Sequence, residues 1–264
     1  MKVLNEEFSK TEVVQKTSFK QVRGEEEEKI DPSKAMDSAI PRNDISSKIT
    51  PALIKKISDK NWKVRKEALD EIESILNAAG MRIQTTGSEK IFKALKERMN
   101  DPNKSLVRQS LSLTGKMAEA LGSDCSKFTK SMVPKLISNL ADKQSLLRQD
   151  ALAAIDKWSQ EAGPESIINQ TATPLTQENP ELRTELLNWL LAHKENLPKC
   201  DLKPMVQGIL GCLQDRSSGI RNAAELLFAE VIDQVGFESL EPFLKDIKPA
   251  VMNSLRSVID KYRG

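Results

Sequence analysis

Runs of hydrophobic residues at helical spacing flank a charged stretch near residue 60. One run covers residues 48–57 and stops at Ser58 and Asp59. The next recurs every three or four residues, at Val64, Ala68, Ile72, Ile75 and Ala79. Because this spacing places apolar side chains on one face of an α-helix, the pattern predicts two helices. The stretch between them, residues 59–65, is predicted to be a tight turn, and it contains Trp62.

A short string repeats five times after residue 44. In each copy an apolar residue precedes an arginine, and a small or apolar residue follows three positions later; the arginines are Arg65, Arg108, Arg148, Arg183 and Arg221. Successive arginines lie 35 to 43 residues apart. This is the period of HEAT-type helix pairs, which bury their apolar faces only by stacking on their neighbours.

The repeat period decides the predicted fold. From residue 44 to the end no segment shows sustained alternation of apolar and polar residues, which a β-strand would require. Residues 237–246 and 248–262 read as a further helix pair that caps the stack through Phe243, Leu244 and Ile247. The sequence therefore predicts an all-α fold, an α-solenoid of about six HEAT-type helix pairs, with Trp158 and Trp189 in its core.

An aspartate precedes most of these arginines by six or seven positions, as Asp59, Asp101, Asp142 and Asp215. Such an aspartate can accept backbone N–H groups where the second helix of a pair begins, and the arginine can reach the aspartate of its own or the adjacent turn. We therefore expect these charges to form an internal ladder rather than a binding surface. The fourth copy differs, because residues 178–180 replace its aspartate turn and Pro174 interrupts its first helix.

Residues 1–45 differ from the rest of the chain. They have little apolar periodicity, a run of four glutamates at 25–28, and prolines at 32 and 41. This composition is typical of a linker or flexible N-terminal extension. The predicted boundaries are therefore an extension over 1–45 and a helical-repeat domain over 46–264.

Charge and composition narrow the possible functions. The 40 basic and 38 acidic residues leave a net charge of +2, which gives no reason to expect nucleic-acid or membrane-surface binding. No apolar run approaches the roughly 18 residues of a membrane span, and the N-terminus lacks a signal-peptide core, so a cytosolic or nuclear location is expected. Three scattered cysteines, Cys125, Cys200 and Cys212, predict reduced thiols rather than disulfides.

No catalytic constellation is recognisable. His193 is the single histidine and lies within a predicted helix, where a half-buried structural role is expected. Phosphate-binding glycine loops, nucleophile elbows and paired-histidine metal motifs do not occur. We therefore expect a protein that is not an enzyme and needs no cofactor or metal, and that works through its surface.

The predicted turns offer a candidate surface, because stacked repeats bring equivalent turns to one edge. A Trp in a charged turn either folds back onto its own helix pair or stands exposed as an anchor for a partner. Around this edge the sequence places one aromatic residue and a row of mostly basic ones, which suits an acidic protein surface. These candidate site residues are Lys60, Trp62, Lys63, Asn103, Lys104, Lys143, Arg183 and Arg216.

Several of these segments resemble the TOG domains of the microtubule polymerase family that includes ch-TOG and Minispindles. The resemblance covers about residues 40–264 and is strongest at 41–46, 59–67, 81–84 and 100–107; the combination looks most like the fourth TOG domain of an array. It implies a six-repeat solenoid whose turns bind the αβ-tubulin dimer or the microtubule lattice, with Trp62 against β-tubulin and the later basic residues continuing along the dimer. It also implies a cytoplasmic, cytoskeletal location at microtubules, spindle and centrosome. The isolated domain is expected to be monomeric.

Two other functions are considered. One is a HEAT-repeat scaffold that binds a non-tubulin partner in its concave face and uses Trp62 only for folding. The other, nucleic-acid binding along the basic edge, would need a stronger basic excess and interleaved aromatic residues, so no nucleic-acid or membrane partner is expected.

Overall fold

The chain divides into two units, Met1–Ile40 and Pro41–Gly264. The computed structural model describes residues 40–245 and 247–260, so the extension predicted over 1–45 lies mostly outside the described residues. The second unit begins before the predicted boundary at residue 46, because residues 41–45 pack onto it. Ile45 is buried, and Asn43 forms a parallel β-bridge with Ile83.

The described part of the second unit is built from helices. The first and second helices of six successive pairs are α2 (Pro51–Ile57) with α3 (Trp62–Ala78), α4 (Ser88–Arg98) with α5 (Lys104–Leu121), α6 (Thr129–Ser138) with α7 (Ser145–Ala162), α8 (Pro164–Ile168) and α9 (Ala172–Leu175) with α10 (Pro180–Ala192), α11 (Val206–Leu213) with α12 (Ser218–Val235), and α13 (Phe237–Leu244) with α14 (Pro249–Ile259). Short 3₁₀ segments are η1 (Ser46–Lys48), η2 (Gly122–Phe128), η3 (Asn139–Ala141), η4 (Lys194–Lys199) and η5 (Lys203–Met205). The predicted all-α solenoid is confirmed.

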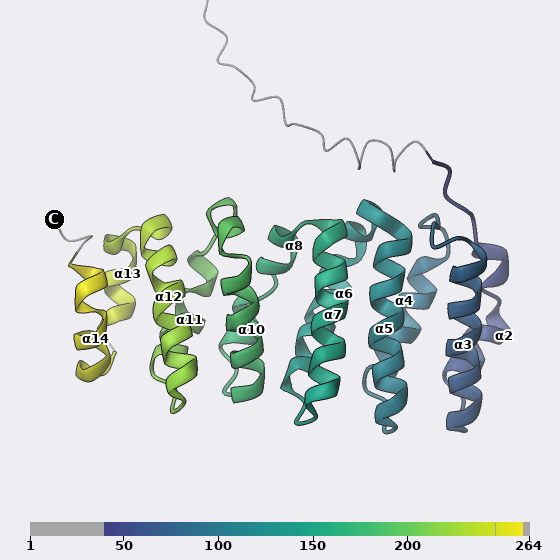
Figure 1. Cartoon of the computed structure of the whole chain (residues 1–264), viewed down its shortest axis with the longest axis horizontal. Coiled ribbons are helices and arrows are strands. Elements are labelled where there is room, and N and C mark those ends of the chain that lie inside the picture. Colours follow the sequence, from purple (N-terminus) through teal and green to yellow (C-terminus); the bar gives the residue numbers. More distant parts are fainter. Residues whose placement is uncertain (1–39, 246, 261–264) are drawn as a thin grey trace, which may run out of the picture. The chain divides into compact units, whose positions relative to one another are not determined.

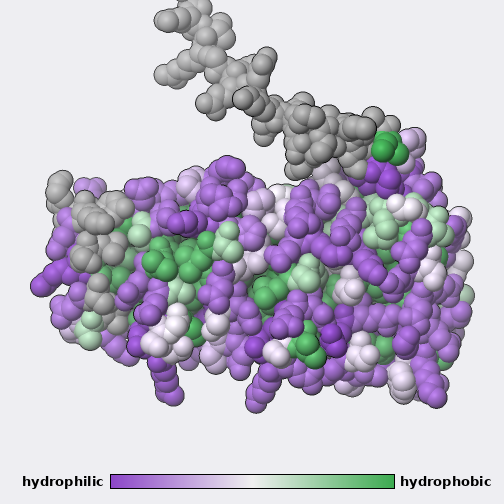
Figure 2. Space-filling model, viewed as in Figure 1, coloured by the Kyte–Doolittle hydropathy of each residue, from purple (hydrophilic) through white to green (hydrophobic). Residues whose placement is uncertain are grey.

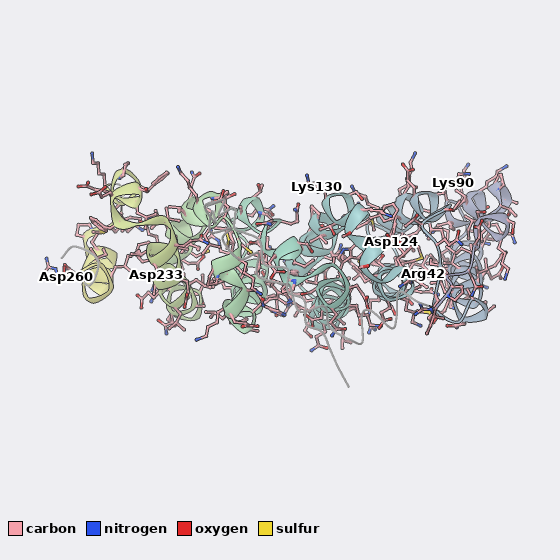
Figure 3. All side chains as sticks on the ribbon, turned by 90° about the horizontal axis from the view of Figure 1, so that it is seen from above. Arg42, Lys90, Asp124, Lys130, Asp233 and Asp260 are labelled. Carbon is pink, nitrogen blue, oxygen red and sulfur yellow. The ribbon has the colours of Figure 1, made fainter. Side chains whose placement is uncertain are left out.

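The second helices α3, α5, α7, α10 and α12 stand side by side in chain order (Figure 1), and the view from above shows the first helices as a second row (Figure 3). One continuous apolar core lies between the rows. Trp158 and Trp189 are both buried in it, as predicted. The indole N–H groups donate to Thr129 Oγ1 at 3.0 Å and to Asp156 Oδ1 at 2.8 Å, respectively, so neither polar atom is buried without a partner.

The first helix of the fourth repeat is interrupted, as predicted, but not at Pro174: the break lies at residues 169–171, between α8 and α9, and Pro174 lies within α9. At the end of the stack, Leu244 and Ile247 are buried as expected, but Phe243 is exposed. The prediction for Phe243 was wrong because the buried face of α13 carries Leu240 and Leu244, and Phe243 borders an open hollow beside Pro242 and Ile247.

Two further features of the fold are the burial of its cysteines and the length and polarity of its helices. The three cysteines are free and buried, and burial raises the pKa of Cys125 to about 12 and that of Cys212 to about 11. Among the described residues, the helices are all too short or too polar to cross a bilayer.

Candidate functional site

The turns that lead into the second helices share one backbone design. In four of them an aspartate side chain accepts the backbone N–H of the residue two positions later, at 2.7 to 2.9 Å. This is an Asx turn, and the acceptors are Asp59, Asp101, Asp142 and Asp215. The predicted role of these aspartates is confirmed, with one refinement: they hold the residue just before the helix.

That residue caps the helix in the first two turns. Asn61 and Asn103 each accept the backbone N–H two positions later, from Lys63 and Ser105, at 3.0 Å. Gln144 occupies the same place before α7 and has a similar extended backbone, but its side chain makes no capping bond. A glutamine side chain is one methylene longer than an asparagine side chain, so its oxygen does not meet the first N–H groups of the helix.

In three of the turns an arginine one turn into the helix holds the turn from inside. Arg65, Arg148 and Arg221 each donate from Nη1 to two carbonyls, at 2.8 to 3.2 Å: that of the turn aspartate and that of the residue after it. The residues after the aspartates are Lys60, Lys143 and Arg216. Their carbonyls are held by the arginines while their side chains are exposed, so three equivalent cations stand at equivalent tips.

Contacts between neighbouring turns place those tips on one edge. Arg65 Nε lies 2.8 Å from Asp101 Oδ2 in the next turn, and Arg98 Nη1 lies 2.8 Å from the same oxygen. Burial alone would raise the pKa of Asp101, but the hydrogen bonds from Arg65 and the backbone of Asn103 and the charges of Arg65 and Arg98 hold it below its ordinary value of 3.8. The expected internal ladder is confirmed here.

Two further contacts continue the ladder. Lys104 Nζ lies 2.5 Å from Asp142 Oδ2, and Arg183 Nη1 lies 2.6 Å from Asp215 Oδ2. The hydrogen bond from Lys104 is the main reason that the pKa of Asp142 is lowered. We call the surface formed by the tips of these turns and the first residues of the second helices the turn edge; it follows the lower margin of the stack in Figure 1, which Figure 2 shows to be largely hydrophilic.

The second arginine of the repeated string does not belong to the ladder in the same way. In the other repeats the arginine is the fourth residue after the one that precedes the helix; these are Arg65, Arg148, Arg183 and Arg221. In the second repeat that position is held by the buried Val107. Arg108 is therefore shifted outward by one position. It is exposed and pairs with Asp150 of α7, with Nε and Oδ2 2.5 Å apart.

Five of the eight candidate residues are exposed on the turn edge and take no part in the ladder: Lys60, Trp62, Lys63, Lys143 and Arg216. Trp62 is the first residue of α3 and is 45% exposed, so its ring is not enclosed by its own repeat. None of the four cations forms an ion pair with a described residue.

The other three candidates lie differently. Asn103 is half-buried and serves as a helix cap, and Lys104 is exposed but its charge is matched by Asp142. Arg183 is only 6% exposed and is paired with Asp215. The expectation that Arg183 stands free on the edge was wrong, because it occupies the inward clamp position of its repeat.

One exposed large apolar residue on this edge was not a candidate in the sequence. Leu146, the second residue of α7, is 55% exposed. Its sequence signal is a pair of leucines, Leu146 and Leu147, at the start of a helix that needs only one apolar residue there.

The remaining chemistry of the described residues is sparse. Beside the fifth turn lies an open hollow of about 700 Å³, lined by Glu178, Arg183, Gln214, Arg216 and Lys248 among others. No group of three or more His, Cys, Asp or Glu side chains in the described part of the chain is placed to hold a metal ion. His193 is half-buried, stacks on Trp189 and has Nδ1 2.9 Å from the Trp189 carbonyl oxygen, which is the structural role expected.

Comparisons with known proteins give consistent similarities. A family model described as CLASP N terminal matches residues 43–256. Centrosomal protein 224 of Dictyostelium discoideum is 32% identical over 228 residues, which are 84% of this chain and 11% of that protein. Protein mini spindles of Drosophila melanogaster is 29% identical over 235 residues, which are 86% of this chain and 11% of that protein. The chain thus spans about a tenth of the length of these relatives.

Solved structures agree on the fold. A chain from work on microtubule plus-end tracking by XMAP215, CLIP-170 and EB1 superimposes with a TM-score of 0.63 at 21% identity. The match covers 86% of this chain and 97% of that one.

Proposed function

The chain belongs to the CLASP N-terminal domain family, as a TOG domain related to that of Mini spindles, and from this premise we propose that its turn edge binds αβ-tubulin. The observation that carries the proposal is the exposed indole of Trp62 beside Lys60 and Lys63, followed along the same edge by Lys143 and Arg216. Trp near the centre of a contact supplies much of the binding energy of an interface. Unpaired cations favour an acidic partner.

The action proposed is binding and positioning, not catalysis. The module holds the tubulin dimer, or the microtubule lattice, and so contributes to the regulation of microtubule growth by a longer polymerase. The segments that resemble a fourth TOG domain, among them the packed lead-in 41–46, support that place in an array. The names of the relatives support a cytoplasmic location on microtubules, spindle and centrosome.

The test is a titration of the labelled chain with purified αβ-tubulin, for the wild type and for Trp62→Ala. Loss of a central aromatic anchor costs about 2–4 kcal/mol, so Kd is expected to rise by roughly 30-fold or more. The thermal midpoint should hardly change, because the ring is exposed at the first position of α3. Leu226→Ala is the control: Leu226 is 64% exposed and lies well inside α12, away from the turn edge.

An unchanged Kd in Trp62→Ala contradicts the proposal. If the thermal midpoint falls while the affinity stays the same, the HEAT-repeat scaffold with a non-tubulin partner becomes the better description, since it uses Trp62 only for folding.

A further inference from the structure

Leu146 is a large apolar residue that the fold does not use. It is the second residue of α7 and is 55% exposed, whereas Leu147 beside it is completely buried and supplies the apolar side chain that the core needs at this point. Burying a leucine side chain is favourable by about 1.5–3 kcal/mol, and Leu146, at 55% exposed, realises only part of this in the free protein. Its apolar surface is available to a partner.

The repeat register shows which way Leu146 faces. The second residues of the other long second helices are Lys63, Ser105, Glu181 and Gly219, none of which is apolar. The second helices stand side by side (Figure 1), and equivalent positions at their starts therefore point to the same edge. Leu146 occupies the position of Lys63, and Lys143 occupies the position of Lys60. The third turn thus resembles the first, with a cation at its tip and a large apolar side chain within the first two residues of its helix: Trp62 at the first position of α3 and Leu146 at the second position of α7.

The second turn, between them, offers neither. Lys104 is matched by Asp142, and Asn103 is used as a cap. Neighbouring packed helices lie about 8–10 Å apart, so Trp62 and Leu146, two helices apart, are separated by roughly 16–20 Å. One pocket on a partner cannot take both side chains. They must meet two separate apolar spots.

From this arrangement we infer that Leu146 is a second apolar anchor of the turn edge, which sets the register of the bound partner and selects a rigid folded surface. This inference rests on the proposed binding of αβ-tubulin. The partner surface carries two apolar spots two repeats apart, each beside acidic groups that face Lys60 and Lys143. A flexible peptide that contacts Trp62 does not hold a second apolar group at a fixed distance against Leu146. It is therefore expected to bind the edge more weakly than a folded partner does.

The test extends the tubulin titration to Leu146→Ala and Leu146→Lys. Removal of a half-exposed leucine side chain should raise Kd roughly three- to tenfold, with an unchanged thermal midpoint. Leu146→Lys should weaken binding at least as much, because the contact is apolar. Leu226→Ala, the same truncation of an even more exposed leucine away from the turn edge, should bind as the wild type does.

Wild-type affinity in Leu146→Ala, or tighter binding in Leu146→Lys, overturns the inference. If Trp62→Ala loses affinity in the same experiment, the proposed function stands without the second anchor. If neither Trp62→Ala nor Leu146→Ala changes Kd, both proposals fail together.

Discussion

Single charged residues in the turns have one of two roles, and the backbone decides which. Arg65 and Arg148 point inward and donate hydrogen bonds to carbonyl groups of their turns, among them those of Lys60 and Lys143. The side chains of Lys60 and Lys143 are exposed to solvent. The inward group stabilises the turn, and the outward group is left for a partner.

Asp101 is the most enclosed of the inward charges. Its side chain is completely buried between Arg65 and Arg98. Asp101→Ala leaves two guanidinium groups without their shared partner, and breaking such a buried pair costs about 3–5 kcal/mol. We expect urea unfolding at neutral pH to show this loss. Asp124→Ala, which removes an exposed pair with Lys127, should change stability by no more than about 1 kcal/mol.

The same variant has a pH signature. Since the pKa of Asp101 is lowered in the folded protein, its contribution is complete above its unfolded value of 3.8 and is lost as the pH falls through the folded pKa. The stability difference between wild type and Asp101→Ala should therefore shrink below about pH 4. A constant difference at acid pH would show that the carboxylate charge is not the cause.

Residue roles were predictable where the cause was local. Trp62 was identified as exceptional because a charged turn has no core to cover it. Arg183 was predicted both as a member of the internal ladder and as a candidate on the edge, and the sequence did not decide between the two; it pairs with Asp215 of the next turn, 32 positions along the chain. Phe243 was misplaced for a related reason: its sequence shows that it is apolar, but not which helix face the neighbouring repeat covers.

At the scale of helices, the residues that precede α5 and α7 differ by one methylene group. Asn103 caps α5, whereas Gln144 in the same backbone conformation leaves α7 without a side-chain cap. A good cap is worth about 0.5–2 kcal/mol. Gln144→Asn should raise the free energy of unfolding and Asn103→Gln should lower it, both measured by urea unfolding. The reciprocal exchange is its own control, because opposite signs are expected from the same chemical change.

The apolar periodicity of the sequence predicted where the helices lie, but it did not predict which residue of each repeated string faces inward. The string around Arg108 looked equivalent to the others, yet its turn has the same length as theirs. Arg108 stands one position later in its helix and is exposed, and the buried Val107 takes the inward position. A spacing of seven instead of six between aspartate and arginine was the visible sign.

At the scale of the molecule, the net charge of +2 conceals an uneven distribution. Four cations without ion pairs to described residues, Lys60, Lys63, Lys143 and Arg216, lie on the turn edge. Such a row accelerates association with an acidic partner, and salt screens it over about 8 Å at physiological ionic strength.

We therefore expect the double variant Lys143→Ala/Arg216→Ala to associate with tubulin more slowly and with less salt dependence than the wild type, measured by stopped-flow mixing at several ionic strengths. The control is Lys90→Ala/Lys130→Ala. It removes the same charge from the starts of α4 and α6, labelled in Figure 3, at the opposite ends of the first helices from the turns. Equal salt dependence in the two double variants would exclude a special role for the edge.

Neighbouring repeats are joined at this edge by the pairs Arg65–Asp101, Lys104–Asp142, Arg148–Glu185 and Arg183–Asp215. The spacing between the turns is therefore fixed in the free protein, before a partner binds. Recognition then depends on length as well as chemistry, and little ordering entropy is lost on docking. A core mutation that tilts one repeat would displace the turns of all later repeats relative to the earlier ones. Such a mutation would weaken binding without changing any side chain that contacts the partner.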